Sequence, residues 1–313
     1  MTITFFSKLK IGSKISILPI LAIVGLIIIS SVNTHSRRKI SEMNSVIQKT
    51  HNAAITMTQQ LHLESNYLSK PDSSLYSKIE ENQSDIADFI KESNSISISI
   101  IESDLLNKIE EINKKHNDIF AKARDIVLEI LNHQSELITL FHESDNLAGE
   151  KVDEISLSIT HLMIEGKTLS GSKRELRNSL REFIGLTSNA MLNTNELLFF
   201  SNPERYEAAE KKRENTFALV TRACRALSVV TNDPSDETMW KKIEAKLDRI
   251  NELRKHIFDH WQIRETLSEE LRQAHSEIQI TMQRLVDITN NETKQLALHH
   301  KEVNMITFGL VLI

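Results

Sequence analysis

The feature that most constrains the fold is residues 103–165, a run without proline whose only glycine is Gly149. Its apolar residues recur in steps of three and four, interrupted only at His116 and His133, at Leu105, Ile109, Ile112, Ile119, Ala123, Ile126, Ile130, Leu137 and Leu140. A period near 3.5 residues predicts one long helix buried along a single stripe. At about 1.5 Å per residue, such a helix is on the order of 90 Å long. One compact domain cannot contain it, so the rest of the chain is expected to lie along it.

The composition favours an all-α protein. Only seven glycines, four prolines and 5% aromatic residues occur in 313 residues, which leaves few turns for a sheet. The net charge of −5 gives no basic excess, so no nucleic-acid partner is expected. Cys224 is the single cysteine, which excludes an internal disulfide and leaves the compartment open.

Two segments have the character of membrane helices. Residues 15–32 carry no charge and follow Lys8, Lys10 and Lys14, so they predict a transmembrane helix over about 15–33. A cleaved secretory signal is the alternative. The three lysines favour a cytoplasmic location for residues 1–14.

The other candidate membrane segment is at the C-terminal end. Residues 305–313 are uncharged and read as the start of a second transmembrane helix. Residues 34–304 would then be an extracytoplasmic region, which in a Gram-negative cell is a periplasmic loop anchored in the inner membrane.

The pattern of helices between these segments is short, short, long, twice over. Proline-marked breaks at Pro71, Pro203 and Pro234, with Gly166 at the end of the first long helix, delimit them. The motif E-x-x-Y-L-S-x-P at 64–71 matches E-x-x-F-F-S-x-P at 196–203, and K-I-E at 108–110 matches K-I-E at 242–244. Two matches in order, at nearly equal offsets, indicate a duplication.

This repeat predicts two stacked four-helix bundles that share two long helices. A proximal module is expected over about 36–133 and 268–304, and a distal module over about 134–267. Transmembrane helices are expected to flank the pair.

The architecture and the motifs resemble the helical bimodular (HBM) sensor domain of methyl-accepting chemotaxis proteins, which are transmembrane chemoreceptors. The opening K-L-K-I-G-S-K-I at 8–15 is similar to the start of many such receptors. The resemblance covers almost the whole chain and implies a homodimer that binds a small organic anion, usually a carboxylate, and signals across the membrane in chemotaxis. In that family paired arginines often precede the E-x-x-Y-L motif; here Gln59, Gln60 and His62 stand before Glu64.

Polar residues on or beside the apolar stripes are the candidate ligand-binding residues. For the proximal module they are Gln59, His62, Asn66, His116, Arg272 and His275. For the distal module they are Arg222, Arg225 and Arg254, which suit an anion. The alternatives are satisfied structural histidines, a solvated helix face and surface ion pairs.

No catalytic constellation stands out, so we expect no enzyme and no cofactor. His133 also interrupts the first long stripe, and His256 and His260 lie on one helical face, but spacing identifies no third ligand and we predict no metal site. Two further functions stay open. One is the sensor region of a membrane histidine kinase that responds to a partner protein, and the other is a membrane-tethered coiled-coil spacer without a ligand.

Overall fold

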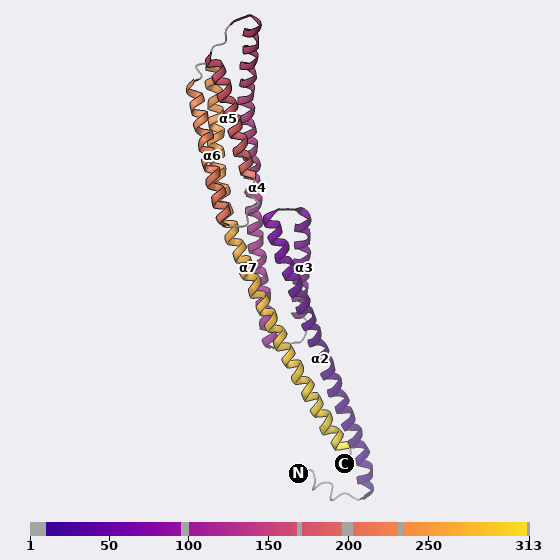
Figure 1. The fold of residues 1–313 in the computed structure, drawn as a ribbon. Helices are drawn as coiled ribbons and strands as arrows, with labels where there is room; N and C mark the ends of the chain where they lie inside the picture. The colour runs from indigo at the N-terminus through magenta and orange to yellow at the C-terminus, as the bar shows by residue number, and fades with distance from the viewer. Residues whose placement is uncertain (1–10, 95–99, 168–170, 196–202, 231–233, 312–313) are drawn as a thin grey trace. The chain divides into compact units, whose positions relative to one another are not determined.

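The computed structural model describes residues 11–94, 100–167, 171–195, 203–230 and 234–311, and every element in these ranges is an α-helix. The helices are α2 (Ile11–Ser69), α3 (Ser73–Asn94), α4 (Ile100–Ile164), α5 (Gly171–Asn195), α6 (Pro203–Val230) and α7 (Pro234–Val311). Figure 1 shows their order along the chain. The predicted all-α fold is confirmed. The helices α3, α5 and α6 are short, but α2 is 59 residues long, because the expected first bundle helix continues without a break from the expected membrane segment.

The helix boundaries follow from local chemistry. At the start of α3 the Asp72 carboxylate accepts a hydrogen bond from the Ser74 backbone amide at 2.7 Å. Hydrogen bonds from the Ser74 side chain and from this amide lower the pKa of Asp72. At the end of α4, Gly166 adopts a φ of 68°. The amides of Lys167 and Gly166 donate to the carbonyls of Leu162 and Met163, at 2.9 and 3.2 Å. These are the two bonds of a Schellman motif, so the predicted glycine terminus is confirmed.

The chain divides into two compact units, and α2, α3, α4 and α7 contribute residues to both. Unit 1 comprises Met1–Leu61, Ile79–Asn117 and Gln273–Ile313, and unit 2 comprises His62–Lys78 and Asp118–Arg272. The sequence places the boundaries between the proximal and distal modules near residues 133 and 268. The boundaries between the two units lie instead at residues 117 and 272. No glycine or proline stands at either place, so the sequence holds no local signal for the change.

The core of unit 1 is built from four helices. It consists of Ala53 and Met57 from α2, Ile86, Phe89 and Ile90 from α3, Leu106, Ile109 and Ile112 from α4, and Ala274, Ile278, Met282 and Leu285 from α7. Each helix presents a stripe at spacings of three and four, as the amphipathic pattern requires.

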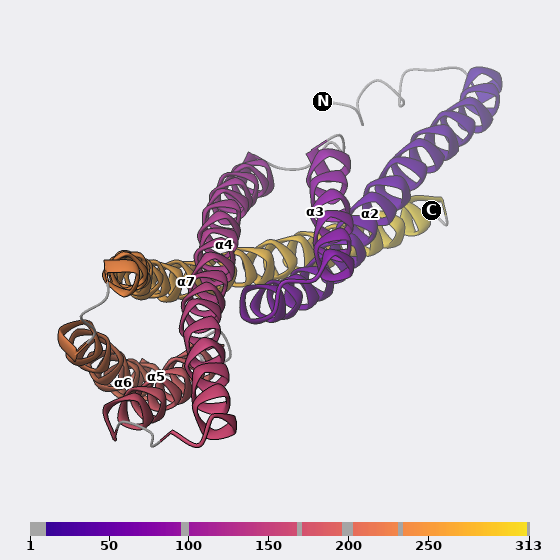
Figure 2. The ribbon, with the colours of Figure 1, turned by 90° about the horizontal axis from the view of Figure 1, so that it is seen from above.

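The core of unit 2 is larger and joins α4, α5, α6 and α7. Its least exposed members include Leu180, Phe183, Val220, Trp240 and Leu253. The helices α5 and α6 lie side by side in Figure 1 and again in the view from above in Figure 2. The ring centroids of Phe183 and Trp240 lie 6.1 Å apart in an edge-to-face arrangement. This contact packs α5 against α7.

The two expected membrane segments are only partly described. In the described part of the chain, no helix combines the length and hydropathy that a membrane crossing needs. The side chains of residues 11–22, 28, 29 and 306–313 lie outside the described set. The transmembrane assignments of 15–33 and 305–313 therefore stay predictions.

Candidate functional site

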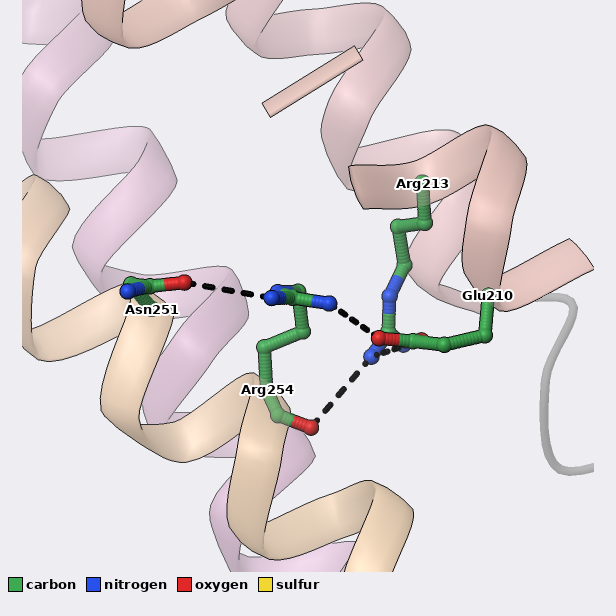
Figure 3. Close-up of polar contacts among 4 residues, drawn as sticks. All are labelled: Glu210, Arg213, Asn251 and Arg254. Carbon is green, nitrogen blue, oxygen red and sulfur yellow. Dashed lines mark hydrogen bonds and ion pairs between the residues drawn. The ribbon is translucent and has the colours of Figure 1, made fainter. Parts of the chain in front are cut away.

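The strongest concentration of buried charge lies between α6 and α7 in unit 2. Glu210 and Arg213 are one turn apart on α6, and Asn251 and Arg254 are one turn apart on α7. Figure 3 shows the four side chains meeting between the two helices. Arg213 is 2% exposed and Arg254 is 8% exposed, which is rare for arginine unless it is paired.

Both arginines bind the same carboxylate. The Arg213 Nη2 atom lies 2.7 Å from Oε2 of Glu210, and the Arg254 Nη1 atom donates to Oε1 of Glu210. Arg254 also donates to the Asn251 side-chain oxygen at 3.3 Å, and Arg213 donates to the Arg254 carbonyl at 3.5 Å. The cluster therefore holds two positive groups against one negative group.

The electrostatics of Glu210 reflect this competition. Burial raises the pKa of Glu210, and the guanidinium groups of Arg213 and Arg254 oppose that rise. Glu214 is a further negative neighbour of Glu210 and also raises its pKa. Guanidinium groups are strong donors for a small anion, and their planar geometry matches a carboxylate. The alternative role is an internal ion cluster that fixes how α6 packs on α7.

A second buried polar group lies in unit 1, where His116 of α4 and His275 of α7 are both buried. The two imidazoles interact electrostatically. Burial lowers the pKa of His275, and the neighbouring His116 lowers it further. The Nδ1 atom of His275 is buried and has no hydrogen-bond partner, so a polar contact is open there. His116 and His275, which the sequence predicts as binding residues of the proximal module, therefore lie close together.

The other predicted residues of the proximal module are exposed. Gln59, His62 and Asn66 all lie on the exposed side of α2, and the His62 and Asn66 side chains bond each other at 3.1 Å. Arg272 is exposed in unit 2, where it pairs with Glu269 at 2.6 Å. Gln59 belongs to unit 1 and His62 to unit 2. Their part in binding stays a prediction, and their geometry is that of a solvated helix face.

The three predicted distal arginines do not converge. Arg254 is buried in the cluster with Glu210, whereas Arg222 and Arg225 are exposed on α6. Arg225 stands 3.9 Å from Glu244, a loose surface pair. Arg222 lines an open groove of about 460 Å³ between α5 and α6, which also holds Glu175 and Glu182.

Several polar residues with little exposure are not among the predicted site residues. They include the half-buried Glu210 and the buried Arg213 on α6, and Gln60 and Glu64 on α2, the latter two both 0% exposed. A signal existed for the first pair, since Glu210 and Arg213 are opposite charges three residues apart beside the partly buried Ala209. A further signal was Glu64 itself, which falls on the apolar stripe of α2.

The described residues contain no group of three or more His, Cys, Asp or Glu arranged to hold a metal ion. Cys224 is buried in unit 2, and burial raises its pKa to about 12. Its thiol is therefore protonated at neutral pH and suits neither metal binding nor nucleophilic chemistry.

Comparison with known proteins gives similarity to solved sensor domains. No protein-family model matches the chain, and no curated protein sequence matches it. The TorS sensor domain in complex with TorT in the presence of TMAO is 18% identical, with a TM-score of 0.44, over 78% of this chain and 99% of that one. The sensor domain of the V. parahaemolyticus histidine kinase sensor TorS is 16% identical, with a TM-score of 0.47, over 81% of this chain and 99% of that one.

Proposed function

We propose that this chain is the extracytoplasmic input region of a membrane receptor that senses a small anion, with a carboxylate as the chemical class. The observation that supports it best is the pair of buried arginines, Arg213 and Arg254, that share Glu210 inside unit 2. The role is binding and signalling, without catalysis and without a cofactor. The chain acts at the inner membrane, as a homodimer, with residues 34–304 in the periplasm.

The binding step uses the two guanidinium groups of the cluster. A ligand carboxylate accepts hydrogen bonds from one or both guanidinium groups, which are the strongest donors for a planar anion. Glu210 then loses part of its positive surroundings. Since burial already favours its neutral form, Glu210 takes up a proton or turns away as the ligand enters.

The signalling step follows from the helices that carry the cluster. Glu210 and Arg213 belong to α6, and Arg254 belongs to α7, so the ligand replaces contacts that hold these two helices together. A ligand shifts a conformational equilibrium only if it binds one packing better than the other. The helix α7 continues unbroken from Pro234 to Val311, so it is the element that transmits the change.

The output of the receptor is the finer part of the proposal. The resemblance in the sequence favours a chemotaxis signalling module, and a histidine kinase core is the alternative. The signalling module that the receptor carries decides between them. A methylation-type coiled coil supports the first and a kinase core supports the second.

The test is thermal unfolding of the 313-residue chain in detergent micelles, with a panel of small carboxylates and their uncharged amide analogues. At one hundred times its dissociation constant, a bound ligand contributes about 2.7 kcal/mol to stability. We expect at least one carboxylate, and not its amide, to raise the midpoint temperature by several degrees. A panel in which no carboxylate shifts the midpoint contradicts the proposal.

Matched variants locate the site. Arg213→Gln should abolish the shift, because it removes one of the two buried guanidinium groups. Arg249→Gln should retain it, because Arg249 is an exposed residue of α7 that pairs with Glu136 at 2.9 Å. A shift that survives Arg213→Gln but is lost in His275→Gln places the ligand in unit 1, beside His116.

A further inference from the structure

Three histidines gather between α4 and α7 in unit 2, away from the arginine cluster's contacts. His133 comes from α4, and His256 and His260 come from successive turns of α7. The His133 ring centroid lies 5.5 Å from that of His260 and 5.8 Å from that of His256. The two α7 rings are 6.5 Å apart, so all three imidazoles form one group.

The surroundings of this group favour uncharged rings. The His133 and His260 planes are nearly parallel, at 14°. The Nδ1 atoms of His133 and His260 are both buried and have no hydrogen-bond partner. A protonated imidazole donates from both ring nitrogens, so protonation leaves a buried donor without an acceptor at each of these atoms.

Two carboxylates lie near this group. Glu129 lies 3.4 Å from Nε2 of His260. Glu136 also faces His133, but Arg249 already binds both of its oxygens, at 2.9 and 3.3 Å. A proton on His133 therefore meets two neighbouring imidazoles and a carboxylate that is already paired.

We propose that His133, His256 and His260 form a proton-responsive contact between α4 and α7, which packs when the imidazoles are neutral and separates when they are protonated. The device goes beyond the anion-sensing role, since acid alone operates it. It makes the packing of the two long helices within unit 2 sensitive to the mildly acidic range in which histidine titrates.

The direction of the pH dependence can be derived from His133. Burial lowers its pKa, and the imidazoles of His260 and His256 lower it further, while Glu136 and Glu129 oppose them. Because the folded pKa lies below the unfolded value of 6.5, the unfolded chain binds more protons as the pH falls. The contribution of His133 to the stability of unit 2 is therefore fully present above pH 6.5 and decreases as the pH falls below 6.5.

The experiment follows the full chain in detergent micelles by thermal unfolding between about pH 7.5 and about pH 5.5, the range of histidine titration. We expect the midpoint temperature of the wild type to be several degrees lower at the acidic end of this range. In His133→Gln we expect this decrease to be at most half as large. The control is His161→Gln, an exposed histidine of α4 in the same unit, which should fall as the wild type does. Equal falls in wild type and His133→Gln overturn the proposal.

A second measurement follows the wild-type chain. Its imidazole proton resonances report the titration of each histidine, with assignments from single-histidine substitutions. We expect His133 to titrate below 6.5, the ordinary value for histidine. A His133 midpoint at or above that value overturns the proposal. Glu129→Gln should enlarge the acid-induced fall, because it removes a carboxylate that opposes the lowering of the His133 pKa.

Discussion

Lys151 of α4 and Asp236 of α7 form an almost buried ion pair in unit 2, with the Lys151 Nζ atom 2.6 Å from Oδ1 of Asp236. Their side chains are only 10% and 9% exposed. Burial lowers the pKa of Lys151, but hydrogen bonds to Asp236 and Glu154 outweigh burial and leave that pKa above its usual value. Asp236 also stands in the first turn of α7, where a negative charge favours the helix.

Breaking this pair should destabilise the chain. Asp236→Asn leaves the Lys151 ammonium group largely buried and without its main counter-charge, which costs about 2 to 4 kcal/mol. The measurement is the free energy of unfolding from urea titration followed by circular dichroism. The matched control is Glu237→Gln, one residue further along α7, because Glu237 forms an exposed pair with Lys241. Equal losses for the two variants would show that the burial of the pair has no energetic role.

The edge-to-face contact of Phe183 with Trp240 gives a second prediction. Phe183 is 0% exposed and Trp240 is 2% exposed, so truncating the ring opens a cavity between α5 and α7. Phe183→Ala should lower the free energy of unfolding by about 3 to 5 kcal/mol. Leu192→Ala on the same helix should change it little, since Leu192 is 61% exposed. A small effect at Phe183 would mean that α5 is not packed on α7 in solution.

The prediction for Cys224 concerns chemical reactivity. With burial raising its pKa to about 12, only about one thiol in ten thousand is ionised at pH 8, and the thiolate is the reactive form. The native chain should therefore react with 5,5′-dithiobis(2-nitrobenzoate) at least roughly 100-fold more slowly than the chain unfolded in urea. The control is the double variant Cys224→Ser, Ala226→Cys, which moves the thiol to a nearby exposed position. The thiol at position 226 should react quickly without urea. Fast reaction of native Cys224 would contradict its burial.

The fold was accessible from the sequence because its signals are periodic and local. The stripe over 103–165 has the spacing of a helix, and Ile109, Ile112, Ile119 and Ile130 are indeed buried. Gly166 ends α4 with a positive φ, as its lack of a Cβ allows. The division into units was less accessible, because contacts between distant segments determine it and no residue type marks it.

The candidate site was predictable only where a polar residue interrupted an apolar stripe. His116, His275 and Arg254 do so, and all three are buried. On α2 the selected residues Gln59 and His62 are exposed, whereas their neighbours Gln60 and Glu64 are buried. One residue is a rotation of about 100° around the helix, so a one-residue step exchanges the solvent side for the core.

The distal arginines illustrate the other limit of sequence reasoning. Arg222, Arg225 and Arg254 share a residue type and a region, but a common ligand needs convergent side chains from facing helices. Arg254 meets Glu210 and Arg213 instead, across α6 and α7. That pairing depends on the register between two helices, which local spacing does not encode.

The last prediction concerns Asp145, a carboxylate of α4 held against α5. Its two oxygens accept hydrogen bonds from the hydroxyl groups of Thr187 and Ser188, the second at 3.3 Å. Burial nevertheless raises the pKa of Asp145, with these two hydrogen bonds opposing it. The folded pKa therefore lies above the unfolded value of 3.8, so the folded chain binds more protons just above that pH. Stability thus decreases as the pH rises through this window, and the deficit persists at neutral pH.

Asp145→Asn removes the buried charge and keeps an oxygen for the Thr187 hydroxyl. We expect the variant to be more stable than wild type at neutral pH and to lose this advantage as the pH falls toward and below 3.8, where the unfolded Asp145 carboxyl becomes protonated as well. Urea unfolding at several pH values from about 7 down to about 4 measures the difference. Asp153→Asn, at an exposed position of α4, controls for the change in net charge and should show no such trend. A variant that is less stable than wild type at neutral pH would mean that the charge itself holds α4 to α5, so that the hydroxyl hydrogen bonds outweigh the cost of burial.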